Sequence, residues 1–265
     1  MKPRILVTND DGVTAPGLLA LVQAMRELGE VSVLAPDRNW SGGGHVKTIN
    51  RPLRVREVTL ADGTTAFASD GAPSDCVALG VLGYFDKKFD LVVSGINPMA
   101  NLGHDVTYSG TVTAAMEAVI WSVPAIAFSL DSPENHLGLQ DYYAAGRAAR
   151  IVAQQVLERR LPPSVLLNVN VPLRPWDEIQ GFSITRQGMR VYRDRLEERI
   201  DPRGTPYYWI GGEAPTGIPE KGTDVGSLDD GYISVTPLQL DLTAYLAQQV
   251  LNKWQWEDTK IPVAA

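Results

Sequence analysis

Polar residues stand directly after several short apolar runs in this 265-residue chain. The segment Asn9-Asp10-Asp11-Gly12 follows the first run, residues 37–44 follow the second, and Gly95-Ile96-Asn97 follows a later one. If these runs are parallel strands, their carboxyl ends meet at one edge of a sheet, where ligands bind in open α/β folds. Carboxylate, hydroxyl and amide oxygens would then gather at that edge.

Oxygen donors of this kind suit Mg²⁺, Mn²⁺ or Ca²⁺. Zinc would favour His and Cys, which are not grouped in this chain. Two adjacent carboxylates repel each other, and a cation beside them removes that cost. Asp-Asp-Gly taken alone is more often a turn before a helix cap, and that interpretation stays open. Its place at a strand end, together with two further polar strand ends, favours a metal site.

A second segment has the residue types of a phosphate site. Tyr108-Ser109-Gly110-Thr111 stands directly before a helical pattern. Backbone N–H groups at a helix start, with two hydroxyls and a glycine, can surround a phosphate. An ordinary Ser or Thr cap is the common role of such a segment. Metal and phosphate donors in the same chain make one combined site the better interpretation.

The elements that must position these residues alternate between strand and helix patterns. We expect strands over 4–8, 31–35, 90–94, 125–130 and 165–171, helices over 16–28, 73–84, 111–121 and 141–160, and a β-hairpin within 48–69 that turns at Asp62-Gly63. This rhythm predicts an α/β fold with a mainly parallel sheet and helices on both of its faces.

The pattern changes after about residue 180. Residues 183–210 contain β-like runs in which Arg and acidic residues are mixed, a strand ends near residue 238, and a final helix is expected over 243–254. We therefore divide the chain into an α/β catalytic core, residues 1–180, and a hairpin and helix extension, residues 181–265. The mixed charges predict a solvated, ion-paired hairpin. Because such a hairpin cannot cover its own faces, we expect it to pack on a partner subunit.

Composition limits the possible partners. The formal net charge is -7, so binding to a long nucleic acid is not expected. Cys76 is the only cysteine, which excludes an internal disulfide. No apolar stretch reaches the length of a signal peptide or a membrane span. These features predict a soluble, cytoplasmic protein.

Four sequence blocks resemble the signatures of one family. They are TNDDG at 8–12, APDRNWSG at 35–42, SGIN at 94–97 and YSGTVTAAME at 108–117. Their order and intervals, with YYWIG at 207–211 and the segment 222–243, resemble the SurE family of stationary-phase survival proteins. The resemblance runs from Arg4 to about Trp254. Met99 and Ala118 depart from it, since the family often has Gly there.

The resemblance implies a Rossmann-like three-layer core and a C-terminal β-hairpin and helix extension used in oligomerisation, giving a homodimer or homotetramer. It implies a 5'-nucleotidase, a metal-dependent phosphomonoesterase that hydrolyses nucleoside 5'- and 3'-monophosphates to nucleoside and phosphate, with short polyphosphate as a further substrate. One divalent cation per subunit, Mg²⁺ or Mn²⁺, is implied as cofactor. By position, the metal ligands are Asp10, Asp11, Ser41 and Asn97. The implied phosphate-binding residues are Asn9, Asn101, Ser109, Gly110 and Thr111.

Asp10 and Asn9 are the candidate catalytic residues. Asp10 would assist proton removal from the attacking water, and Asn9 would orient the phosphate or the water. His104 is a candidate acid for the leaving group by its sequence position alone. A lone loop histidine is more often a solvated surface residue.

Other functions fit the sequence less well. An aspartyl-phosphate phosphatase needs a second Asp two residues after the first, but Gly12 and Val13 stand at those positions. The dinucleotide fingerprint G-x-G-x-x-G is absent after the first strand, and there is no G-x-S-x-G of a serine hydrolase. A nucleotide-binding regulator without turnover stays as an alternative of a different class.

Overall fold

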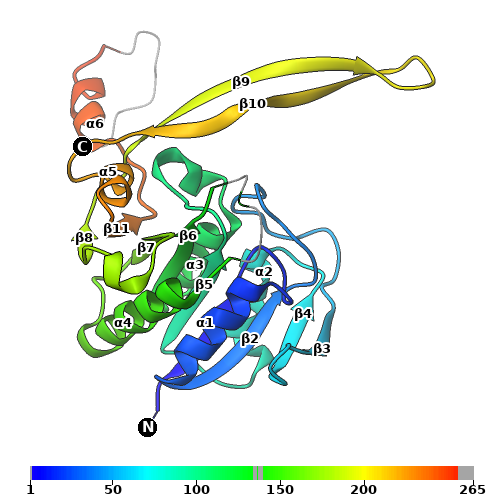
Figure 1. The fold of residues 1–265 in the computed structure, drawn as a ribbon, viewed down its shortest axis with the longest axis vertical. Coiled ribbons are helices and arrows are strands. Elements are labelled where there is room, and N and C mark those ends of the chain that lie inside the picture. Colours follow the sequence, from blue (N-terminus) through cyan, green and yellow to red (C-terminus); the bar gives the residue numbers. More distant parts are fainter. Residues whose placement is uncertain (1, 134–135, 137–139, 256–265) are drawn as a thin grey trace.

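A computed structural model describes residues 2–133, 136 and 140–255. The main body is a nine-stranded sheet with helices on both faces (Figure 1). In spatial order its strands are β3 (Val55–Thr59), β4 (Thr65–Ser69), β2 (Glu30–Pro36), β1 (Arg4–Thr8), β5 (Leu91–Asn97), β6 (Ala125–Asp131), β7 (Val165–Pro172), β11 (Ile233–Gln239) and β8 (Phe182–Ile184). All pairings between neighbouring strands from β4 to β7 are parallel. Strand β3 pairs antiparallel with β4, and β11 pairs antiparallel with β7. The predicted α/β class and the hairpin around Asp62-Gly63 are confirmed.

Two helix pairs cover the sheet. Helices α1 (Pro16–Arg26) and α4 (Tyr143–Arg159) pack on one face, and α2 (Pro73–Leu79) and α3 (Gly110–Ile120) pack on the other. Alternating residues of a strand point to opposite faces. Accordingly, Ile5 and Val7 of β1 belong to the core under α1 and α4, whereas Leu6 belongs to the core under α2 and α3. The central strands are therefore apolar on both sides, which explains their unbroken apolar runs.

The helix expected over 73–84 changes character at its end. Its α-helical part stops at Leu79, and residues Gly80–Tyr84 form a wider turn in which Gly83 has φ +119°. Three short 3₁₀ or helical pieces were not expected from the sequence, namely residues Gly103–Thr107, Trp176–Glu178 and α5 (Asp224–Asp229). The final helix, α6, spans Tyr245–Leu251 and is shorter than expected. Within the described ranges, none of the helices is both long and apolar enough to span a bilayer.

Strands β9 (Met189–Ile200) and β10 (Pro206–Ile218) form a separate antiparallel hairpin that projects from the body (Figure 1). Its register is interrupted between Glu213 and Thr216. The division of the chain at residue 180 stays a prediction. The sheet continues across that point, because β8 and β11 join it from the C-terminal part.

Candidate functional site

A pocket of about 560 Å³ opens at the carboxyl ends of β1, β5 and β6 and beside the loop after β2. Six of the predicted site residues line it, and they come from four separate segments. They are Asp10, Asp11, Ser41, Asn97, Asn101 and Ser109. The strand-end argument therefore identified side chains that the fold brings to one pocket.

Asp10 is almost fully buried at the end of β1. The Thr111 hydroxyl donates a hydrogen bond to Asp10 Oδ1. Burial raises the pKa of Asp10, against the opposing effects of this hydroxyl and of the backbone amides of Thr111 and Gly110. A Cβ at Gly110 would lie 2.6 Å from the Asp10 Cβ, so glycine is required for helix α3 to begin this close to the carboxylate. The start of α3 and the end of β1 thus form one unit.

Asp11 is next to the Asp10 carboxylate, and the two negative charges repel each other. Burial and the charge of Asp10 raise the pKa of Asp11 to about 7. Its Oδ2 is buried and has no hydrogen-bond partner among the described residues. A divalent cation at this point would satisfy the unpaired oxygen and reverse the repulsion between the two carboxylates. The donor set therefore fits such an ion.

Ser41 and Asn97 reach the same pocket from the flanking strands. The Trp40 N–H donates to the Asp10 carbonyl oxygen at 2.7 Å, which fixes the loop after β2 beside the end of β1. Asn97 ends β5, and its Nδ2 donates to the Met99 carbonyl at 2.5 Å, which leaves Oδ1 for the pocket. In the described part of the chain, no three His, Cys, Asp or Glu side chains group as a metal site. A cation here would therefore need the neutral oxygens of Ser41 and Asn97 as well.

The predicted phosphate residues occupy two kinds of position. Ser109 lines the pocket and caps α3, since its Oγ accepts from the Val112 N–H at 3.1 Å. Asn101 also lines it, and its Nδ2 donates to Ser129 Oγ at 2.8 Å. Asn9, Gly110 and Thr111 are buried behind this surface. Asn9 Nδ2 donates to the Gly12 carbonyl at 2.9 Å, and Asn9 Oδ1 has no partner among the described residues.

Comparison with known proteins identifies the family of this chain. The family model described as "Survival protein SurE" matches residues 5–194. This chain belongs to the SurE family. The "5'-nucleotidase SurE" of Chloroflexus aggregans is 51% identical over 253 residues, 96% of this chain and 99% of that protein. The protein of the same name from Herpetosiphon aurantiacus is 52% identical over 254 residues, with coverage of 96% and 99%. The crystal structure of the Sure protein from Aquifex aeolicus has a TM-score of 0.79 at 42% identity and covers 94% of this chain and 98% of that one. The family resemblance and the fold expected from it are confirmed.

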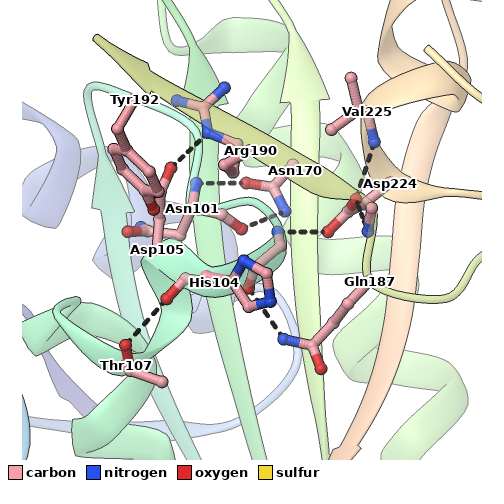
Figure 2. A network of polar contacts seen from close by, with 12 residues as sticks. Asn101, His104, Asp105, Thr107, Asn170, Gln187, Arg190, Tyr192, Asp224 and Val225 are labelled. Atoms are coloured by element: carbon pink, nitrogen blue, oxygen red, sulfur yellow. Dashed lines mark hydrogen bonds and ion pairs between the residues drawn. The ribbon is translucent and has the colours of Figure 1, made fainter. Parts of the chain in front are cut away.

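The pocket of this SurE protein is also lined by residues that were not predicted from the sequence. Asp131 at the end of β6, Arg190 of β9 and Ala214-Pro215 of β10 all line it. Arg190 is held in place because its Nε donates to Asp105 Oδ2 at 2.7 Å, and the Tyr192 hydroxyl donates to the other oxygen of the same carboxylate (Figure 2). The strand-end rule would have found Asp131. Only the return of the hairpin to the body brings in Arg190.

Two further observations concern residues near the site. His104, the candidate acid, is exposed and is not among the residues that line the pocket. Glu117 of α3, by contrast, is buried and accepts from His45 Nε2 at 3.0 Å, from Lys47 Nζ at 3.2 Å and from Trp121 Nε1 at 2.8 Å. Because His45 and Lys47 follow Ser41 in the same loop, this cluster holds that loop against α3.

Proposed function

We propose that this chain is a 5'-nucleotidase of the SurE type, a phosphomonoester hydrolase that converts nucleoside 5'-monophosphates to nucleoside and phosphate. One observation carries the proposal. Two desolvated carboxylates, Asp10 and Asp11, share a pocket with the oxygen donors Ser41 and Asn97 and with Ser109 at the start of a helix. This combination suits a cation and the phosphate dianion that it would bind. The names of the relatives support the same activity.

The cofactor we propose is one divalent cation per subunit, Mg²⁺ or Mn²⁺, held by Asp10, Asp11, Ser41 and Asn97. Oxygen ligands of this type match both ions. When bound, the cation supplies charge neutralisation at the phosphate and makes water a stronger nucleophile at neutral pH.

Side chains and backbone groups of the chain would remove the proton from the water and bind the phosphate. Asp10 Oδ1 accepts from the Thr111 hydroxyl, so we assign Oδ2 to proton removal from the attacking water. The Ser109 oxygen accepts from Val112, which leaves its hydroxyl hydrogen to donate to a phosphate oxygen. Gly110, Thr111 and the positive end of α3 would favour the negative charge of the phosphate.

Asn9 and Asn101 have supporting roles in the proposal. Asn9 directly precedes the two carboxylates in the chain, and its unpaired Oδ1 can accept from the attacking water and orient it. A contact with the phosphate would use the second hydrogen of Nδ2, whose first hydrogen is donated to the Gly12 carbonyl. Asn101 is fixed by Ser129 through its side chain and by Asn168 and Asn170 through its backbone, which suits a rigid phosphate contact.

The test is phosphate release from nucleoside 5'- and 3'-monophosphates and from short polyphosphate, each with Mn²⁺, with Mg²⁺ and with EDTA. Release from the 5'-monophosphates that EDTA abolishes is the expected result. The arms with 3'-monophosphates and polyphosphate decide whether these belong to the substrate range. A folded protein that releases no phosphate with either metal would refute the proposal and favour a nucleotide-binding regulator.

We also propose a homodimer or homotetramer built through the hairpin and the C-terminal segment. The hairpin exposes large apolar side chains far from the body, including Leu196 at 66% and Trp209 at 62% of their surface. Apolar surface of this extent on a two-stranded hairpin commonly marks an interface.

A further inference from the structure

The pocket extends beyond the residues proposed to bind the cation and the phosphate. Those residues come from β1, from the loop after β2, from β5 and from the start of α3. Asp131 ends β6, which is the next strand after β5 in the sheet. Neighbouring strands are about 5 Å apart. Asn97 is opposite Ser129 in the β5–β6 ladder, so Asp131 lies one strand over and two residues further towards the carboxyl end. At about 3.3 Å per residue along the strand, the two backbone positions are about 8 Å apart, a separation that suits two neighbouring groups of one small molecule.

The Asp131 carboxylate is poorly satisfied by the protein. It is partly buried, and burial raises its pKa, whereas the charge of Arg190 lowers it. Among the described residues, no hydrogen bond and no ion pair involves its side chain. A desolvated carboxylate without donors gains strongly from a ligand that supplies them.

The surrounding charges argue against a second cation at this point. Asp105 is the other carboxylate on this wall, and it already accepts from Arg190 and Tyr192 (Figure 2). Among the described residues that line the pocket, Arg190 is the only Lys or Arg, and its charge acts on Asp131 without forming an ion pair with it. A cation would be repelled by Arg190, but a neutral ligand with hydroxyl donors would not.

We propose that Asp131 binds the ribose of the substrate by accepting hydrogen bonds from its hydroxyl groups. A carboxylate at the carboxyl end of a parallel strand makes the same type of contact in dinucleotide-binding folds. The charge of Arg190 partly opposes the effect of burial on Asp131, and the ion pair with Asp105 keeps Arg190 in position. The inference rests on the proposed nucleotidase function and adds the class of sugar that the site selects.

Asp131→Ala and the isosteric Asp131→Asn are compared with wild type on adenosine 5'-monophosphate, on its 2'-deoxy and 3'-deoxy analogues and on p-nitrophenyl phosphate, which has no ribose. For Asp131→Ala, kcat/KM on the ribonucleotide should fall about 10- to 100-fold further than kcat/KM on the aryl phosphate, as expected for lost hydrogen bonds to a charged acceptor. Asp131→Asn keeps one acceptor and should fall between Asp131→Ala and wild type. The matched control is Asp177→Asn, which changes an exposed carboxylate outside this pocket and should leave all four rates unchanged.

Two outcomes would overturn the inference while leaving the nucleotidase function intact. They are an equal loss on the ribonucleotide and the aryl phosphate, and no loss on either. If wild type releases no phosphate, the proposed function fails. Calorimetry then tests the contact without turnover. Asp131→Ala should weaken the binding of adenosine 5'-monophosphate more than it weakens the binding of the 2'-deoxy and 3'-deoxy analogues, and an equal effect on all three ligands would overturn the inference.

Discussion

Glu117→Gln should destabilise the protein although Glu117 lies outside the pocket lining. Burial alone would raise the pKa of Glu117, but hydrogen bonds from His45, Trp121 and Lys47 outweigh burial and lower the pKa to about 2. Relative to the ordinary value of 4.5, this corresponds to about 3 kcal/mol of preference for the ionised form. Lys47 is half exposed, so solvent screens part of its contribution. We expect the substitution to cost about 1–3 kcal/mol.

The pH dependence of this cost has a definite sign. A folded-state pKa below the unfolded one contributes stability that is fully present above the unfolded value. This contribution is lost as the pH falls from about 4.5 towards about 2. The difference in stability between wild type and Glu117→Gln should therefore be constant near neutral pH and should shrink in acid.

The assay is urea unfolding followed by tryptophan fluorescence at pH 7, 5 and 3.5, at one protein concentration, with thermal unfolding in parallel. At about 2–4 °C per kcal/mol, a cost of about 1–3 kcal/mol should lower Tm by about 2–12 °C at pH 7. Glu158→Gln is the matched control, because Glu158 is an exposed residue of α4 that bonds only Gln154, and it should cost less than about 0.5 kcal/mol. If Glu117→Gln behaves like this control, or if its cost is the same at pH 3.5 as at pH 7, the proposed charge cluster does not stabilise the fold.

The remaining predictions concern the pocket and the hairpin. Asp10→Asn should keep the fold but lower turnover at least about a hundredfold in saturating Mn²⁺, and a rate near wild type would exclude Asp10 from the mechanism. Gly110→Ala places a Cβ 2.6 Å from that of Asp10, so Mn²⁺ binding by calorimetry should weaken about 10- to 100-fold, and an unchanged affinity would contradict the close approach. Leu196→Glu with Trp209→Glu should reduce the mass measured by light scattering to that of the monomer, and an oligomer of unchanged mass would exclude the hairpin as its interface.

The sequence predicted the fold well wherever one face or both faces of an element are buried. Strand β1 and helix α1 have apolar residues at the spacing that burial requires, and both were expected within a few residues of their observed bounds. The place of β11 in the sheet was not predictable in the same way. Its antiparallel pairing with β7 joins segments more than 60 residues apart, and no local pattern records such a partner.

The candidate site was predictable where its residues follow a strand in the sequence, and not where a long-range contact brings them in. Asp10, Asp11, Ser41 and Asn97 follow strands or the loop after a strand, so a rule about strand ends identifies them. Arg190 reaches the pocket through its contact with Asp105, which is 85 residues earlier in the chain. A contact of this kind depends on the path of the whole hairpin, which residue types do not specify.

The antiparallel pairing of β11 with β7 has a consequence for fragments of this protein. The SurE family match ends at residue 194, before β11 begins, although every proposed cation ligand lies within it. A fragment that stopped there would leave the backbone N–H and C=O groups of β7 open along the edge of the sheet, from Val165 to Asn170. An open, apolar edge strand is a template for pairing with other chains. Such a fragment would retain the four signature blocks between residues 8 and 117 and would still be prone to aggregation.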